Sequence, residues 1–224
     1  MGQAIGQILP LAVGVAISPV PIIAVVLMLV TPRARANGPA FVVGWLAGLA
    51  VVGAIVLAVS PDATTDTGGP KTWVSVLKLI LGLALVAMAA KQWRGRPHGD
   101  EEAVTPKWMG ALDAFTPAKS AGAGVVLSAL NPKNLLLIVG GAAAVAQLGI
   151  STGDQVVAWI VFTLIASIGV GAPLVIFFAM GERAAGLLEG LKNWMARNNT
   201  VIMAVLCLII GVKLIGDAIT GFST

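Results

Sequence analysis

Charged side chains are scarce in this sequence. Asp, Glu, Lys and Arg together make up 11% of its 224 residues, whereas apolar residues make up 58%. A typical soluble domain carries roughly 25% charged residues, so this chain cannot cover its own surface with charge. A lipid bilayer is the solvent that suits such a composition, and the length fits one compact membrane domain. We therefore expect an all-α integral membrane protein.

Residues that bind metals or form disulfides are equally rare. Cys207 is the single cysteine and His98 the single histidine. An internal disulfide is therefore excluded, Cys207 is expected to be a small buried hydrophobe, and a transition-metal site has no support. The sequence contains no phosphate-binding P-loop, and its apolar segments hold no nucleophile–base pair or paired carboxylates. We expect neither an enzyme nor a protein that hydrolyses ATP itself, and no cofactor.

Six apolar segments are long enough to cross a membrane, since a spanning helix needs about 20 mainly apolar residues. The N-terminus has no positively charged region before its apolar part, so the first segment is predicted to be a membrane helix rather than a cleaved signal peptide. Short polar stretches separate the segments. The predicted spans are about Ile5 to Val30, Pro39 to Val59, Thr72 to Ala90, Ala118 to Gln147, Gln155 to Met180 and Thr200 to Ala218.

Basic residues are distributed unevenly between the predicted loops. The first, third and fifth loops hold ten Lys and Arg residues, whereas the other two hold only Lys71. Because cytoplasmic loops carry the excess of Lys and Arg, we predict a multi-pass plasma-membrane protein with these loops inside and both termini outside. Membrane topology thus explains the net charge of +4 without nucleic acid. The ten residues are Arg33, Arg35, Lys91, Arg94, Arg96, Lys107, Lys119, Arg183, Lys192 and Arg197.

The two halves of the sequence resemble each other weakly. Leu77 to Val86 aligns with Leu206 to Ile215, which places Gly82 on Gly211. Ala16 to Leu29 similarly aligns with Ser128 to Gly141. Because each half has three helices, an odd number, the halves are predicted to be inverted relative to one another, as in many secondary transporters. The predicted organisation is one transmembrane domain, 1–224, with repeat 1 at about 1–93, a cytoplasmic linker at about 94–117 and repeat 2 at about 118–224.

Prolines interrupt the first and fourth spans at matching places. The first interruption is SPVP, with Ser18, Pro19 and Pro21, and the second is NPKN, at 131–134. Proline breaks the helical hydrogen-bond ladder, and freed backbone groups at membrane depth need protein or water partners. The fourth span, unbroken, would run about 45 Å across a hydrocarbon core of about 30 Å, so we expect a break there. Two ordinary proline kinks that only shape packing are the alternative.

Lysines inside the spans are candidates for a binding site, since ionisable groups there are costly. Lys133 is near the centre of the fourth span, and a half-helix beginning beside it would present amides that attract anions. Lys78 and Lys213 are nearer the outer ends, where snorkelling to the headgroups is the alternative, and Asp217 could pair with Lys213. No Asp or Glu lies deep in a span, which argues against a metal cation and favours an anion.

Three segments together resemble a known family. These are SPVPIIAVVLML, the loop PRARANGPAFVVGW, and LDAFTPAKSAGAGVVLSALNPKNLLL. They resemble the GAP/Sap family, the peptidoglycolipid- and sulfolipid-addressing proteins of actinobacterial cell envelopes, within the LysE-type translocator superfamily. The resemblance implies six helices in an inverted repeat and a role in moving envelope lipids outward. It supports, as the core of a substrate site, Pro19, Pro21, Asn131, Pro132, Lys133 and Asn134.

Three functions follow from these expectations. The first is export of an anionic envelope lipid, glycolipid or polyprenyl-phosphate-type carrier by alternating access. The headgroup would meet Lys133 in a midplane cavity. The second is a small-solute exporter of amino-acid type, and the third a scaffold that transports nothing.

Two stretches, Lys107 to Phe115 and Leu187 to Asn199, are predicted to lie at the membrane surface or to form ordinary loop helices. A homo-oligomer or lipid-export machinery would be the protein partners, and the energy source is open.

Overall fold

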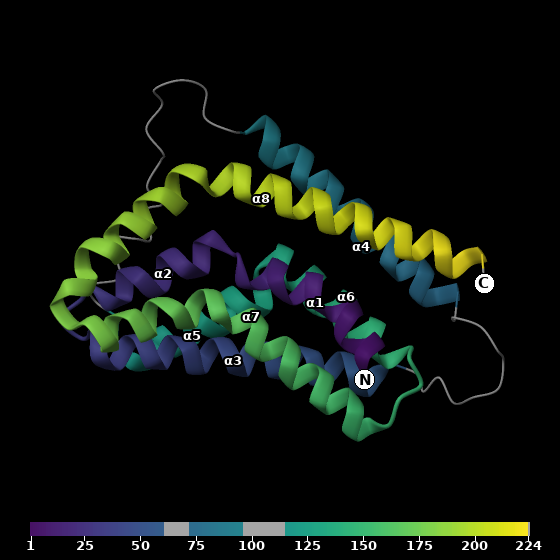
Figure 1. The fold of residues 1–224 in the computed structure, drawn as a ribbon, viewed down its shortest axis with the longest axis horizontal. Coiled ribbons are helices and arrows are strands. Elements are labelled where there is room, and N and C mark those ends of the chain that lie inside the picture. The colour runs from purple at the N-terminus through teal and green to yellow at the C-terminus, as the bar shows by residue number, and fades with distance from the viewer. Residues whose placement is uncertain (61–71, 96–114, 224) are drawn as a thin grey trace.

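The computed structural model describes residues 1–60, 72–95 and 115–223, and within those ranges the chain is helical with no strand. Its helices, coloured along the chain in Figure 1, cover the predicted spans, but α8 begins at Ala184, well before the predicted start of the sixth span at Thr200. The elements are α1 (Gly2–Ala16), α2 (Pro19–Leu29), α3 (Ala34–Val59), α4 (Thr72–Arg94), α5 (Pro117–Val125), the π-helical segment η2 (Val126–Leu130), α6 (Pro132–Ala146), α7 (Thr152–Met180), the 3-10 turn η3 (Gly181–Arg183) and α8 (Ala184–Ser223).

Several of these helices suit a multi-pass membrane protein. Three helical stretches are long and apolar enough to cross a membrane, and there are up to five if each bent helix pair is one span. One of the three is a 72-residue stretch, Thr152–Ser223, which folds back between α7 and α8 (Figure 1). The reversal is at Gly181, whose φ of +56° is a conformation that glycine adopts without strain.

The predicted breaks in the first and fourth spans are confirmed. α1 and α2 meet at a bend of 50°, and α6 bends by 63° from the helix that ends with η2. Both half-helices after the bend begin with proline, and the residue before each proline, Ser18 or Asn131, has extended backbone angles. Proline restricts its predecessor to this region and lacks the N–H that a continuing helix needs. The local sequence therefore produces both bends.

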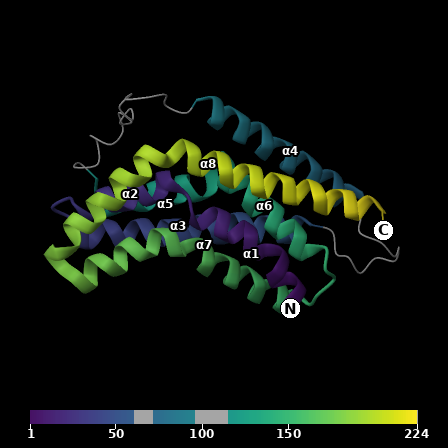
Figure 2. The ribbon, with the colours of Figure 1, turned by 45° about the horizontal axis from the view of Figure 1, so that its top comes forward.

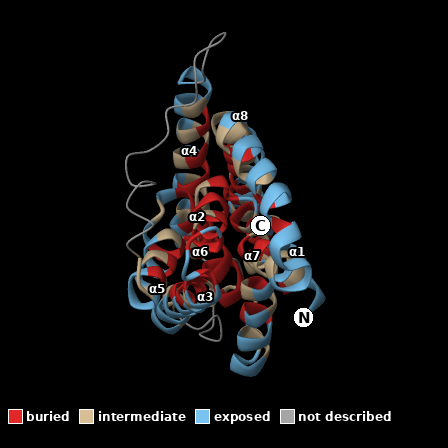
Figure 3. Cartoon of the chain, turned by 90° about the vertical axis from the view of Figure 1, so that its left-hand side faces the viewer, coloured by how far each residue is buried: buried red, intermediate tan, exposed pale blue. Residues whose placement is uncertain are grey.

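The half-helices that follow the bends form the centre of the molecule. Nine of the 11 residues of α2 and 11 of the 15 residues of α6 are buried, compared with ten of the 40 in α8. The other helices surround them, with α3 packed along α5, α1 along α7 and α4 along α8. Figures 2 and 3 show this arrangement, with the buried residues facing inwards. Two polar side chains of the first turn of α6, Lys133 and Asn134, are part of this buried centre.

Glycines allow the outer helices to approach one another closely. A Cβ atom on Gly82 or on Gly211 would be 2.9 Å from the carbonyl oxygen of the other residue. These are the two glycines that the internal alignment places in equivalent positions, and they mark the contact of α4 with α8. A Cβ atom on Gly44 would be 1.9 Å from the carbonyl oxygen of Ala121, where α3 meets α5. Small residues at such crossings suit helix packing in membranes.

The ends of the chain lie together. Both termini are at one end of the molecule, and the α2–α3 and α7–α8 turns are at the other (Figure 1). The predicted surface stretch Leu187 to Asn199 is part of α8. Almost all of the other, Lys107 to Phe115, and most of the predicted linker lie outside the described residues. Which side of a membrane each end faces stays a prediction.

Candidate functional site

The two bends face each other, and polar side chains from both meet between them. Ser18, at the start of α2, is 2% exposed, while Lys133 and Asn134, in the first turn of α6, are 1% and 0% exposed. Hydrogen bonds connect these residues across 115 and 116 positions of sequence. We call Ser18, Asn131, Lys133 and Asn134, with the carbonyls they contact, the Lys133 cluster. Sequence reasoning placed all four side chains in one site, and the structure brings them together.

The ammonium group of Lys133 is held by the first bend. Its Nζ donates to the carbonyl oxygen of Gly14 and to Oγ of Ser18, at 2.6 Å each. Gly14 belongs to the last turn of α1, where carbonyls lack helical partners and carry partial negative charge. The C-terminus of α1 therefore stabilises the cation inside the protein. The polar opening expected at the break is closed in this conformation, because Lys133 is 1% exposed.

The neighbouring asparagines continue the hydrogen-bond network. Ser18 Oγ donates to Oδ1 of Asn134 at 2.9 Å, and Asn134 Nδ2 donates to the carbonyl oxygen of Leu127 at 3.1 Å. Leu127 lies in η2, where π-helical geometry alters the usual backbone pairing. Asn131 caps α6, since its Oδ1 accepts from the backbone N–H of Lys133 at 3.2 Å. The network thus joins α1, α2, η2 and α6.

The prolines of the predicted site shape it rather than contact a ligand through polar atoms. Pro19 and Pro132 occupy the first positions of α2 and α6, and Pro21 is buried two residues further into the first turn of α2. Proline suits the first turn of a helix because its missing N–H is not needed there. Their contribution is to fix the directions of the two half-helices.

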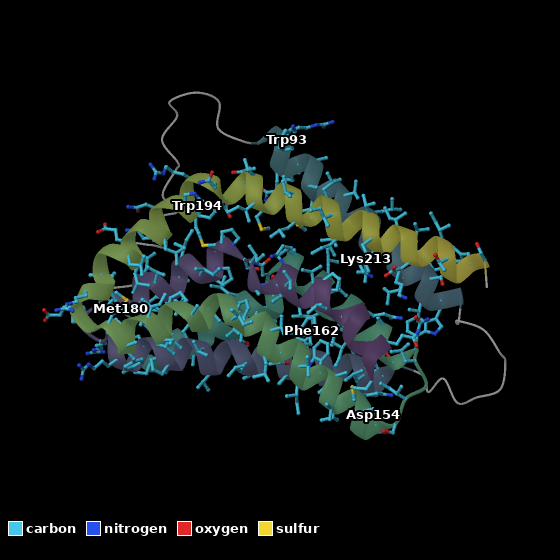
Figure 4. The ribbon with its side chains drawn as sticks, viewed as in Figure 1. Trp93, Asp154, Phe162, Met180, Trp194 and Lys213 are labelled. Carbon is cyan, nitrogen blue, oxygen red and sulfur yellow. The ribbon has the colours of Figure 1, made fainter. Side chains whose placement is uncertain are left out.

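Lys78 and Lys213 are not part of the Lys133 cluster. Lys213 pairs with Asp217, one turn along α8, at an Nζ–Oδ2 distance of 2.5 Å. Lys78 of α4 is close enough to interact with the charges of both residues. Figure 4 shows Lys213 on the side of α8 that borders α4. Among the described residues, no hydrogen bond or ion pair joins either lysine to Lys133.

Two members of the site's surroundings escaped sequence reasoning. Gly14 contributes only a backbone carbonyl, and its one sequence signal is its position four residues before the broken point at Ser18. Cys207 of α8, 1% exposed, is close enough to Lys133 to interact with its charge. It is buried, as expected of a small hydrophobe. Within the described ranges, no group of three or more His, Cys, Asp and Glu residues could hold a metal ion.

The arrangement suits recognition of a negative group. A lysine ammonium in a low-dielectric interior attracts an anion far more strongly than it would in water. The ligands that now occupy it are neutral, a carbonyl and a hydroxyl, so an entering anion would bind the cation more strongly than either. The cluster therefore holds a cation whose present partners are both neutral.

Comparison with known proteins finds one family. The family model described as SfLAP: Sap, sulfolipid-1-addressing protein, matches residues 8–220 of the chain. No curated protein and no solved structure gives a significant match. The match extends over both bends and over all or part of every described helix.

Proposed function

This chain belongs to the Sap, sulfolipid-1-addressing protein, family, and from that premise we propose that it exports an anionic envelope lipid or glycolipid across the plasma membrane. The observation that carries the proposal is the buried ammonium of Lys133 between the two bends. The family description names a sulfolipid, and a sulfate is an anion, as is the phosphate of a polyprenyl-phosphate-type carrier. Either headgroup complements a buried lysine.

The proposed transporter has six membrane crossings in two inverted repeats. The 72-residue stretch would run about 108 Å as one straight helix, over three times the thickness of the hydrocarbon core. Because it folds back at Gly181, we count it as two crossings. Contacts support the repeat, since α3–α5 corresponds to α1–α7 and α3–α6 corresponds to α2–α7 under exchange of the halves. Many secondary transporters are built from such inverted repeats.

Transport in this scheme is a competition for Lys133. The closed cluster would open when one repeat rocks against the other, and the headgroup would replace Gly14 O and Ser18 Oγ as the partner of the ammonium. Closing on the opposite side would restore those two bonds and release the headgroup. In this scheme the carbonyl oxygen of Gly14, at the C-terminus of α1, and Oγ of Ser18 bind the ammonium whenever the headgroup is absent. No residue needs a catalytic role.

Export of a small anionic solute is the second candidate. It is favoured by the enclosure of Lys133, which is 1% exposed, and by the tight contact of α3 with α5 at Gly44. A lipid would need a lateral opening between helices for its acyl chains, whereas a small solute would not.

Native mass spectrometry of the purified protein tests the proposal. Wild type is compared with Lys133→Met, which keeps the side-chain length but removes the charge, and with Lys119→Met at an exposed position of α5. We expect a co-purifying anionic lipid in wild type and in Lys119→Met, and its loss in Lys133→Met. A small bound anion instead of a lipid would support the second candidate. Equal lipid loading of all three proteins would contradict both proposals and favour the scaffold.

A further inference from the structure

A cavity of about 390 Å³ lies well away from the Lys133 cluster. It is formed where the end of α2, the start of α3, the end of α7 and the start of α8 meet, and Leu29, Arg35, Phe178 and Glu182 are among its lining residues. Met180 is next in the sequence to the lining residue Gly181, and Figure 4 shows it at the end of the molecule opposite the termini. Sites for small ligands begin at about 300 Å³, so this cavity is large enough for a lipid headgroup.

The cavity has a buried apolar floor and an exposed apolar rim. Leu29 and Leu188 form the floor and are 3% and 1% exposed, whereas Phe178 on the rim is 55% exposed. The ring of Phe177 stands at 79° to that of Phe178, with centroids 5.4 Å apart. Phe178 is two residues from the end of the predicted fifth span, so the rim faces the boundary of the bilayer, where acyl chains are available to cover it.

Two opposite charges line the same cavity without pairing. Arg35 is in the first turn of α3 and Glu182 is in η3, and both are exposed. In the part of the chain that the structure describes, neither side chain forms an ion pair or hydrogen bond. A purely anionic headgroup would be attracted by Arg35 and repelled by Glu182, and a purely cationic one the reverse. A headgroup that carries both charges satisfies both residues.

We propose that this cavity binds a phospholipid with a phosphate and a primary ammonium, the phosphoethanolamine class. The phosphate accepts hydrogen bonds from the guanidinium of Arg35, whose planar donor fork fits phosphate. The ammonium donates to the carboxylate of Glu182, and such charge-assisted bonds are the strong ones. The acyl chains lie over Phe177 and Phe178. A phosphocholine headgroup has the same charges but no N–H to donate, so it fits less well.

The site is distinct from the proposed substrate site but shares a helix with it. α2 carries Ser18 at its start and Leu29 at its end, about 16 Å apart along the helix axis. A lipid bound at Leu29 therefore anchors the end of α2 that is remote from Lys133. Its charge preference differs from that of the Lys133 cluster, which attracts anions.

Lipid titration followed by native mass spectrometry tests this inference on the full chain. The probes are dioleoyl phosphatidylethanolamine, phosphatidylglycerol and phosphatidylcholine, each added to delipidated protein. In wild type we expect the ethanolamine lipid to bind about tenfold more tightly than the other two, as one charge-assisted bond allows. Arg35→Gln should weaken all three lipids, because each carries a phosphate, and Glu182→Gln should abolish the advantage of the ethanolamine lipid over the other two.

Matched controls separate the cavity from general surface charge. Arg33→Gln and Arg183→Gln remove exposed arginines of the same two turns that do not line the cavity, and both should retain the wild-type preference. Lys133→Met should retain it too, so this inference and the export proposal can fail separately. Equal binding of the three lipids by wild type would overturn the inference, as would an equal loss of affinity in Arg35→Gln and Arg33→Gln.

Discussion

The two bends of this protein are alike in shape and different in chemistry. Each is a short extended link followed by a half-helix that begins with proline, and the bend angles are 50° and 63°. The first bend offers only acceptors and a hydroxyl, from Gly14 and Ser18. The second brings a lysine and two asparagines. Since the first bend forms without a charge, bending alone does not require Lys133.

This difference separates the scaffold from the site. A lysine enclosed in the membrane-spanning part of a protein is costly, and its replacement by an apolar residue is often tolerated or stabilising when its partners are also replaced. A charge that is present on one bend only, and is held by the other bend, fits the proposed substrate site. The predictions below test this comparison, beginning with the largest expected effect.

Replacing the charge should abolish the functional difference between the bends. Lys133→Met removes the ammonium that would bind the headgroup. Charge-assisted hydrogen bonds are worth about 1.5–3 kcal/mol each, and the loss of two of them to the headgroup corresponds to a fall in transport of about a hundredfold or more, while both bends persist. The measurement is inward-to-outward movement of a fluorescent phosphatidylglycerol in proteoliposomes, with Lys119→Met as the control. Unchanged transport in Lys133→Met would remove the site from the second bend.

Adding a methyl group at a close helix crossing should destabilise the protein to the same extent whether the crossing lies beside the first bend or the second. A Cβ atom on Gly44 would be 1.9 Å from the carbonyl oxygen of Ala121, and one on Gly169 would be 1.9 Å from that of Ala16. Gly44→Ala and Gly169→Ala should each destabilise the protein by about 1–3 kcal/mol, because backbone atoms must move apart. Thermal unfolding in detergent measures the effect. Gly171→Ala, with nothing within 4 Å of its new atom, should match wild type, and a stability loss in only one of the first two would mean that one bend is held more loosely.

Removing the hydroxyl of the first bend should have an intermediate effect. Ser18→Ala takes away one partner of Lys133 and one of Asn134, but the bond from Lys133 to Gly14 remains. We expect transport to fall about tenfold, the equivalent of one such bond. The control is Ser167→Ala, whose hydroxyl bonds only within α7, to Thr163. A loss as large as that of Lys133→Met would show that the first bend is as specialised as the second.

Changing the pair on α8 should have the smallest effect. Lys213 and Asp217 are partly exposed, with side-chain exposures of 29% and 35%, and an i,i+4 pair is worth about 0.3–0.5 kcal/mol. Asp217→Asn should leave the same transport assay within about twofold of wild type. If Asp217→Asn abolished transport, the α4–α8 contact would be part of the mechanism, and function would not be confined to the two bends.

The sequence predicts the bends and Lys133 because their signals are local. A proline inside an apolar run breaks a helix wherever that helix packs, and a lysine there is conspicuous. Facing directions are not local, and Lys78 and Lys213 illustrate this. Both lie within helices, as expected, but their charges interact with each other and with that of Asp217 where α4 meets α8. Among the described residues no hydrogen bond or ion pair joins them to Lys133, which only the arrangement of the helices decides.

Backbone ligands and cavities between turns leave even less trace in the sequence. Gly14 holds Lys133 through a carbonyl that every residue possesses, and a glycine in a membrane helix is usually explained by packing. The cavity at Arg35 and Glu182 forms where the α2–α3 turn, near residue 31, meets the α7–α8 turn, near residue 181, at one end of the molecule. These two turns are about 150 residues apart in the sequence. No local sequence pattern indicates that these two turns come together.

The position of Cys207 gives the unmodified protein its own reporter. It is the only thiol in the chain, it is 1% exposed, and it lies beside Lys133. Alkylation by a membrane-permeant maleimide can therefore label one position, and only while the surrounding helices are apart. The rate at which Cys207 is labelled therefore reports how often the Lys133 cluster opens, and it can be measured on the wild-type protein without an engineered probe.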